Sequence, residues 1–138
     1  MLHHLTIRHL ALLKEAKLDF SAGFTALTGE TGAGKSVVLR ALSFLAGSKA
    51  DKALLNAEGT PCEVEGVFLF KDSSRLDRVL EAGGLPPCED GMLIIRRSFS
   101  HDKGSRCWLN GSATNASKLL ALRELWIDFH SPEDHKNS

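Results

Sequence analysis

Eight consecutive residues have the types and spacing needed to hold a polyphosphate. They satisfy the pattern G-x-x-x-x-G-K-[ST] at every fixed position and are Gly29, Glu30, Thr31, Gly32, Ala33, Gly34, Lys35 and Ser36. Glycines let the backbone approach closely and adopt positive φ, so that main-chain N–H groups surround the phosphate oxygens. Lys35 would reach the β- and γ-phosphates, and the Ser36 hydroxyl would ligate a bridging Mg²⁺. The motif therefore predicts a site for a nucleotide with Mg²⁺.

The segments on either side of this motif have the periods that such a loop needs. Alternating polarity predicts strands at residues 3–9, 14–20 and 24–28, before the motif. After it, apolar residues at i, i+3, i+4 and i+7 predict a helix from Ser36, with Gly47 at its C-terminal cap. The residues on that apolar face are Val38, Ala41, Leu42 and Leu45. Strand, glycine loop and helix follow in that order, which aims the positive end of the helix at the phosphates.

Further elements are expected downstream. Residues 49–60 read as a polar surface loop, and residues 63–70 as a strand. Asp72 or Ser73 is expected to cap a short helix whose apolar face comprises Leu76, Val79 and Leu80. That helix ends at Gly83 and Gly84. The segment from Leu80 to Gly84 faintly imitates an L-S-G-G loop, but a helix C-cap is the better interpretation.

The last third of the chain is expected to form a hairpin, a helix and a strand. Strands at residues 92–99 and 106–109 pair across residues 101–105, and Asn110-Gly111 is a strong signal for a tight turn. A helix at residues 117–124 then leads into an apolar strand at residues 125–129. The hairpin carries Arg96, Arg97, Lys103 and Arg106 near Trp108. Contact with a nucleic-acid backbone and a solvated charged strand face both remain open as explanations.

Composition limits the classes of protein that this chain can belong to. The 138 residues suit one domain, and 43% hydrophobic with 25% charged residues is typical of a soluble globular protein. Seventeen basic residues balance seventeen acidic ones, so no overall positive field favours nucleic acid or a membrane surface. Three widely spaced cysteines and the absence of an apolar span or leader favour a cytoplasmic protein with reduced thiols and no membrane contact.

The sequence around the motif resembles the opening of the RecN family of SMC-like repair ATPases. The resemblance is carried by LTIRHLAL at residues 5–12, LDFSAGFTALTGETGAGKS at 18–36, VEGVF at 64–68, IRR at 95–97, RCWLNG at 106–111 and IDFH at 127–130. It implies an α/β P-loop NTPase fold: part of an ABC/SMC-type head lobe with a mixed β-sheet and a P-loop helix. It also implies ATP held between two protomers in a head-to-head homodimer, and recombinational repair of DNA double-strand breaks.

The same resemblance implies that residues 1–138 are one lobe of the head, cut before the coiled coil. The signature serine loop, the Walker B aspartate and the catalytic glutamate would follow that coiled coil, so no catalytic residue is assigned here. Hydrolysis and contact with DNA are then expected only of the full-length protein. Where RecN proteins place a Q-loop glutamine, this chain has Ser131, Pro132 and Glu133.

Two other interpretations remain open. Asp128 ends an apolar run, as a Walker B carboxylate does, and could complete a small self-contained NTPase or kinase. Only ten residues follow it, which is short for the further strands and crossover helices of such a sheet. The chain could also be a non-hydrolysing remnant that binds nucleotide, or an interaction domain whose motif is a relic.

Overall fold

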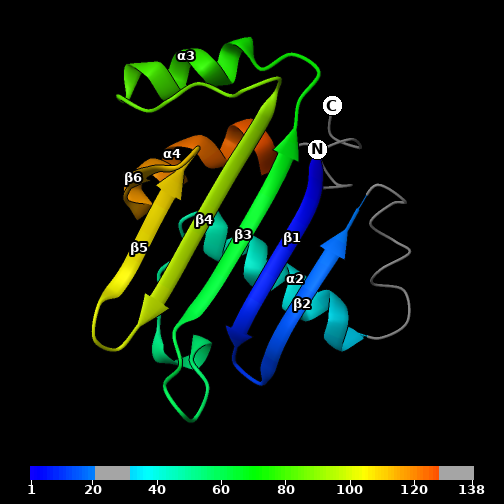
Figure 1. Ribbon diagram of the computed structural model, residues 1–138, viewed down its shortest axis with the longest axis vertical. Helices are drawn as coiled ribbons and strands as arrows, with labels where there is room; N and C mark the ends of the chain where they lie inside the picture. Colours follow the sequence, from blue (N-terminus) through cyan, green and yellow to red (C-terminus); the bar gives the residue numbers. More distant parts are fainter. Residues whose placement is uncertain (21–31, 128–138) are drawn as a thin grey trace.

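The described residues form one antiparallel sheet with helices on one of its faces (Figure 1). The computed structural model describes residues 1–20 and 32–127. For residues 32–35 and 127 it describes the backbone alone. The strands are β1 (Leu2–Leu10), β2 (Leu13–Asp19), β3 (Cys62–Leu69), β4 (Met92–Ser100), β5 (Gly104–Leu109) and β6 (Ser112–Thr114). The helices are α2 (Gly32–Leu45), the 3-10 turn η1 (Lys52–Leu54), α3 (Ser74–Ala82) and α4 (Ala116–Ile127).

The strands lie in the order β2-β1-β3-β4-β5-β6, and each pairing between described strands is antiparallel. Because β3 pairs with β1 and not with β2, the chain crosses the sheet between β2 and β3, and α2 makes that crossing. The strand expected at residues 24–28, on which the mixed character of the sheet would depend, lies outside the described residues. The strands expected on either side of it are confirmed.

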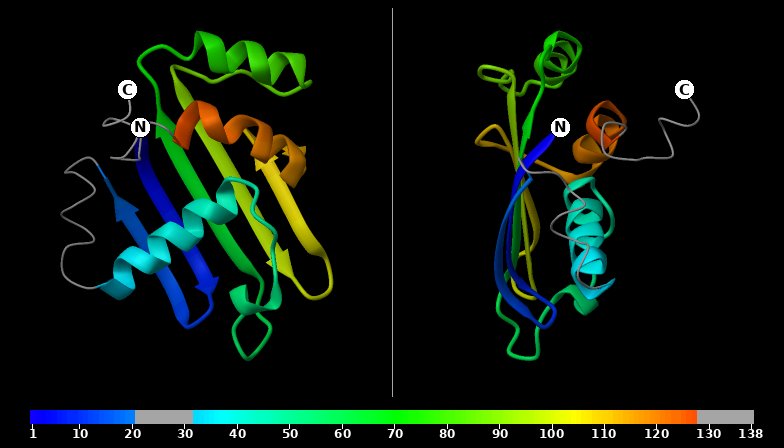
Figure 2. Two further views of the ribbon diagram at one scale, coloured as in Figure 1. Left: turned by 180° about the vertical axis from the view of Figure 1, so that it is seen from behind. Right: turned by 90° about the vertical axis from the view of Figure 1, so that its right-hand side faces the viewer.

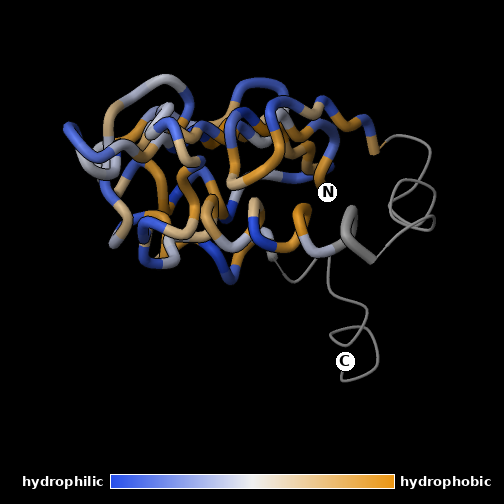
Figure 3. Tube along the Cα trace, turned by 90° about the horizontal axis from the view of Figure 1, so that it is seen from below, coloured by the Kyte–Doolittle hydropathy of each residue, from blue (hydrophilic) through white to orange (hydrophobic). Residues whose placement is uncertain are grey.

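Helices α2 and α4 cover the same face of the sheet, and the opposite face carries no helix among the described residues (Figure 2). Figure 3 shows hydrophobic and hydrophilic positions interspersed in the sheet layer, and buried positions alternate with more exposed ones along β3 and β4. The alternation places one set of strand side chains against the helices: Leu5, Ile7, Val64, Phe68, Leu93, Ile95 and Leu109 are all buried. A core thus lies between sheet and helices.

Helix α2 begins at Gly32, four residues before the predicted start at Ser36, and its C-terminal end matches the expected cap. Its apolar residues Val38, Ala41 and Leu45 are buried against the sheet. Gly47 has φ of 100°, Gly47 N–H donates to Phe44 O at 3.2 Å, and Ser48 N–H donates to Ser43 O at 3.1 Å. These bonds satisfy carbonyls that the last helical turn leaves without partners.

The segment after α2 is more tightly tied down than a polar surface loop. Leu54 and Leu55 are buried, and the Ala11 N–H in the β1–β2 turn donates to Leu54 O at 2.9 Å. Asp51 begins the η1 turn, where its carboxylate accepts a hydrogen bond from Ala53 N–H. The polar composition of residues 49–60 obscured these two leucine anchors.

Helix α3 begins and ends near the predicted residues, although one of its expected core residues is exposed. Ser73 is the N-cap without a side-chain cap bond, and the Asp72 carboxylate instead accepts from Ser74 N–H at 3.0 Å. Leu76 and Leu80 are buried, whereas Val79 is 40% exposed, so its placement on the apolar face was wrong. The C-cap at Gly83 and Gly84 is confirmed.

The strand predicted at residues 125–129 is wrong over residues 125–127, which continue helix α4. Asn115 starts this helix, because its side-chain oxygen accepts from Lys118 N–H at 3.0 Å. Buried Leu119, Leu122 and Trp126 then recur at helical spacing, and the Trp126 ring packs on Phe68 with centroids 4.6 Å apart. Asp128 and Phe129 lie outside the described residues.

The β4–β5 hairpin and the turn after it agree with the sequence. Asn110 and Gly111 have φ of 49° and 83°, the two positive values that a type I′ turn requires. The Asn110 side chain also accepts from Ile94 N–H at 2.9 Å and donates to Pro86 O at 3.1 Å. No helix among the described residues is both long enough and apolar enough to cross a bilayer.

Candidate nucleotide-binding site

The glycine motif coincides with the start of helix α2. The backbone is helical from Gly32, so the last five residues of the motif, 32–36, belong to the helix. The first three, Gly29, Glu30 and Thr31, lie outside the described residues. The first N–H groups of a helix have no partner within it, and the helix dipole adds partial positive charge at this end. The Ser36 side chain is exposed. The observed backbone is compatible with a Mg²⁺–polyphosphate group at this helix end.

The chain reaches the motif from an edge strand that is fixed to its neighbour. β2 pairs with β1 over its whole length, and Phe20 N–H donates to His3 O at 2.9 Å just after β2 ends. The Phe20 side chain is buried. Residue 20, the last described residue before the motif, is therefore anchored by both its main chain and its side chain.

At the other end of α2 lies a charged residue that sequence reasoning placed wrongly. Arg97 was grouped with Arg96 on a basic hairpin, but its side chain is only 2% exposed. Successive strand residues point to opposite faces, so Arg97 points toward the helices while Arg96 points away. The Arg97 guanidinium contacts main-chain oxygens near the end of α2: Nη1 donates to Phe44 O at 2.7 Å and to Ser48 O at 2.6 Å.

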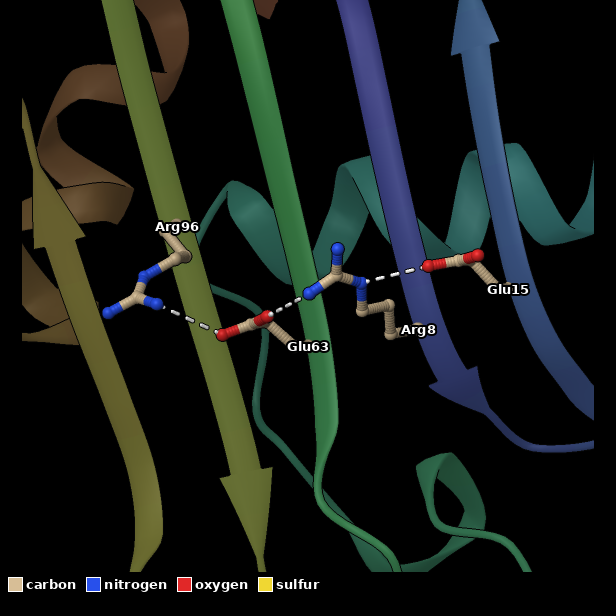
Figure 4. Close-up of polar contacts among 4 residues, drawn as sticks. All are labelled: Arg8, Glu15, Glu63 and Arg96. Atoms are coloured by element: carbon tan, nitrogen blue, oxygen red, sulfur yellow. Dashed lines mark hydrogen bonds and ion pairs between the residues drawn. The ribbon is translucent and has the colours of Figure 1, made fainter.

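Arg96 lies in a row of charges on the face of the sheet turned away from α2 (Figure 4). Glu63 pairs with Arg96 Nη1 at 3.1 Å and with Arg8 Nη1 at 3.6 Å, and Arg8 Nε pairs with Glu15 at 3.1 Å. The Arg96 guanidinium also lies 4.0 Å from the centre of the Trp108 ring. The positive charge of this face is thus balanced locally, which favours the interpretation of a solvated charged strand face.

Two cysteines flank Arg97 in the core. Burial raises the pKa of the Cys62 thiol to about 11 and also raises the pKa of Cys107, although the nearby Arg97 charge acts in the opposite direction on both. Burial likewise lowers the pKa of the Arg97 guanidinium. The raised pKa values keep both thiols in the neutral form near pH 7, which lowers their reactivity.

Two cavities in the described part of the chain lie away from the motif. One, of about 300 Å³, is lined by the outer side of α2 and the segment after it: Leu39, Arg40, Ser43, Phe44, Ser48, Lys49, Asp51, Ala53 and Leu54. The other, of about 480 Å³, lies between residues 58–61 and the β4–β5 turn at residues 100–103. Neither includes Ser36. A pocket at the motif would need residues 21–31, outside the described part.

Sheet, crossing helix and motif together define an α/β P-loop NTPase with the fold of an SMC-type head. The chain belongs to the AAA domain family, whose model matches residues 4–129. Among curated proteins it is similar to the DNA repair protein RecN of Bacillus subtilis (32% identity over 136 residues, 99% of this chain) and of Vibrio cholerae (35%, also 99%). The RecN resemblance seen in the motifs is confirmed.

Solved structures give the same picture of the fold. A structure from work on ATP-driven dimerization and DNA-stimulated activation of SMC ATPases matches with 26% identity and a TM-score of 0.65, covering 97% of this chain and 82% of that one. The Smc head domain of Pyrococcus yayanosii matches at 23% identity with a TM-score of 0.61, covering 89% of this chain and 25% of that one. The recombination mediator RecF matches at 14% identity with a TM-score of 0.58, covering 99% and 37%.

The chain spans about a quarter of the length of the curated relatives that it matches: 23% of the B. subtilis RecN protein and 24% of that from V. cholerae. The matched region is therefore a small part of each of these relatives. The activity and partners of the whole relatives therefore do not transfer to this chain from the match alone.

Proposed function

We propose that this chain is the ATP-binding lobe of a RecN-like protein that acts in recombinational repair of DNA double-strand breaks. One observation carries the proposal: helix α2 begins inside the glycine motif, with Ser36 exposed in its first turns, in a chain similar to RecN along its whole length. A helix N-terminus with free N–H groups is suited to an anionic phosphate. A bound Mg²⁺ would neutralise the developing charge during phosphoryl transfer.

In this proposal the motif residues share the work. The main-chain N–H groups of residues 29–34 surround the phosphate oxygens, Lys35 contacts the β- and γ-phosphates, and Ser36 ligates Mg²⁺. None of these groups would orient the attacking water, so the 138-residue chain binds ATP without hydrolysing it at a useful rate. In a longer protein, a second head would close over the nucleotide, and contact with DNA would involve that assembly.

Other features fit a protein of this kind. Cys62, Cys88 and Cys107 are all free thiols, which is compatible with a reducing cytoplasm. The balanced charges around Glu63 offer no broad positive surface on that sheet face, so DNA contact through this lobe alone is not part of the proposal.

The compact NTPase using Asp128 is disfavoured. That interpretation needs an apolar strand leading to Asp128, but residues 125–127 are helical. Calorimetry and a phosphate-release assay on the 138-residue chain separate the three interpretations. We expect Mg-ATP binding with negligible turnover. Brisk turnover that Asp128→Ala abolishes would instead establish the compact NTPase, and no binding at all would establish a relic motif.

A further inference from the structure

Arg97 is a buried cation that has no carboxylate partner in the part of the chain that the structure describes. It lies on the inner side of β4, and no aspartate or glutamate forms an ion pair with it among residues 1–20 and 32–127. Burying a guanidinium is costly unless its donors are satisfied. An arginine in this position therefore has to be held by well-aligned acceptors, and those acceptors must stay in place.

The acceptors come from two different elements. Arg97 Nη1 donates to the carbonyls of Phe44 and Ser48 at the C-terminal end of α2, and Nε donates to Ser105 Oγ on β5 at 2.9 Å. The guanidinium also lies 4.4 Å from the centre of the Phe44 ring. One side chain thus joins β4, β5 and the last turn of α2.

The helix end is suited to a cation. Carbonyls in the last turn of a helix have no intrahelical partners, and they carry the negative end of its dipole. Two donations from one nitrogen, at 2.7 and 2.6 Å, also fix where the helix end lies along its axis. A shift of α2 by a fraction of a turn would break both bonds and leave the charge buried with poor compensation.

The opposite end of this helix is the phosphate-binding motif. A helix of 14 residues is a stiff rod of about 21 Å, so the axial position of its C-terminal end sets that of its first turn. Gly47 reinforces the constraint, because a Cβ there would lie 2.7 Å from Leu120 Cγ on α4. The C-terminal end of α2 is held from two sides.

We propose that Arg97 is a positioning residue for the nucleotide site: by holding the C-terminal end of α2 against β4 and β5, it fixes the first N–H groups of that helix, from Gly32 onward, where a Mg²⁺–nucleoside triphosphate needs them. This inference rests on the proposed function, since it concerns affinity for that ligand. Coupling between two ends of one element is reciprocal, so nucleotide binding also stabilises the Arg97 contacts.

A test has to separate positioning from simple loss of stability. Arg97→Met removes the donors but keeps apolar bulk, and Arg97→Lys keeps the charge with a different donor geometry. The control is Leu80→Ala, a fully buried residue on α3, beyond the end of the sheet (Figure 1). Urea unfolding of each variant of the 138-residue chain identifies conditions in which Arg97→Met and Leu80→Ala are equally folded.

Calorimetric titration with Mg-ATP under those conditions gives the main result. We expect Arg97→Met to bind about tenfold more weakly than wild type, Arg97→Lys to recover part of the loss, and Leu80→Ala to stay within about threefold. Equal affinities of Arg97→Met and Leu80→Ala would overturn the inference. If wild type itself fails to bind Mg-ATP, the proposed function fails as well, which is a different outcome.

If Arg97→Met does not fold, hydrogen exchange on wild type and Arg97→Lys still tests the inference. In wild type we expect Mg-ATP to slow amide exchange at residues 44–48, remote from the ligand, and we expect Arg97→Lys to reduce that protection. Unchanged exchange at residues 44–48 when the site is saturated would refute the coupling.

Discussion

Gly66 on β3 lies directly against Leu45, the last residue of α2: a Cβ at position 66 would come within 2.7 Å of Leu45 Cδ1. It would also come within 2.9 Å of the Phe68 ring. Leu45 and Phe68 are both fully buried, so neither has free space to move into. The crossing helix packs as closely as it does because β3 lacks a side chain at this point.

Gly66→Ala should therefore push α2 away from the sheet. We expect it to lower the free energy of unfolding by about 1–3 kcal/mol, the usual cost of an extra methyl group in a filled core. Urea denaturation measures the change. Gly83→Ala is the matched control, because Gly83 has φ of −90° and its added Cβ would meet nothing closer than 3.6 Å. Equal effects of the two substitutions would contradict the close packing of α2 on β3.

Gly47 combines a left-handed backbone with a close contact. Its φ is 100°, and an added Cβ would lie 2.8 Å from Ala116 O as well as close to Leu120. Gly47→Ala should cost about 3 kcal/mol, from backbone strain and steric overlap together. Gly84→Ala isolates the strain, since Gly84 has φ of 77° with nothing within 4 Å, and should cost about 1 kcal/mol. Thermal unfolding that ranks the two variants the other way would disprove the close contact between Gly47 and α4.

The charge row on the open sheet face should contribute little to stability. The side chains of Glu63, Arg96 and Arg8 are 30%, 40% and 47% exposed, so solvent screens their ion pairs. We expect Glu63→Gln to lower the free energy of unfolding by less than about 1 kcal/mol, and the difference to shrink as salt is raised. Glu65→Gln, at a residue with no ion pair to the described part of the chain, is the control. A larger, salt-independent loss at Glu63 would mean that the row is more strongly coupled than its exposure indicates.

Asp77 should give the chain part of its acid sensitivity. Burial acts to raise the pKa of this carboxyl, but hydrogen bonds from Cys88 N–H at 2.8 Å and the Ser73 hydroxyl at 2.9 Å outweigh it and lower the pKa. A lowered folded-state pKa stabilises the fold above the unfolded value of about 4, and that stability is lost as the pH falls through the folded value. Urea midpoints of wild type and Asp77→Asn should therefore differ near pH 7 and converge in acid. A gap that stays constant down to pH 3 would contradict the assignment.

The same carboxylate should control a thiol. Burial and the neighbouring Asp77 raise the pKa of Cys88 to about 12, so this half-buried thiol should react slowly with iodoacetamide. Asp77→Asn should accelerate alkylation of Cys88 while leaving buried Cys62 unreactive, as mass spectrometry of the labelled chain would measure. Unaltered labelling of Cys88 would show that burial alone sets its reactivity.

Much of this architecture is legible in local sequence patterns. Strand alternation, the helical face of α2, the glycine cap and the Asn110-Gly111 turn are properties of adjacent residues, and they predicted β1, β2, β3, β4, β5 and α2. The order of the strands could not be predicted in this way, because pairing β3 with β1 depends on contacts between segments far apart in the chain. No local pattern specifies it.

Two of the errors arose because local sequence does not show which distant segment a residue contacts. Leu125, Trp126 and Ile127 form an apolar run too short to distinguish strand from helix, and the contact of Trp126 with Phe68 decides for helix. Arg97 looked like part of a basic surface because the sequence does not show which strand face is covered. Strict alternation from buried Ile95 would have placed Arg97 on the covered side. The sequence pattern predicted the phosphate-binding motif. It did not predict that Arg97 would hold the far end of the helix that begins in this motif.

Nucleotide affinity of the 138-residue chain tests the central claim most directly. Isothermal titration with Mg-ATP should show saturable binding by wild type, and Lys35→Ala should weaken it by roughly 1.5–3 kcal/mol, the contribution of a charge-assisted hydrogen bond. Arg40→Ala removes an equal charge from the exposed side of the same helix, where Arg40 donates to Ala53 O, and should leave the affinity nearly unchanged. Undiminished binding by Lys35→Ala, or an equal loss from both variants, would contradict the assignment of a phosphate site to the glycine motif.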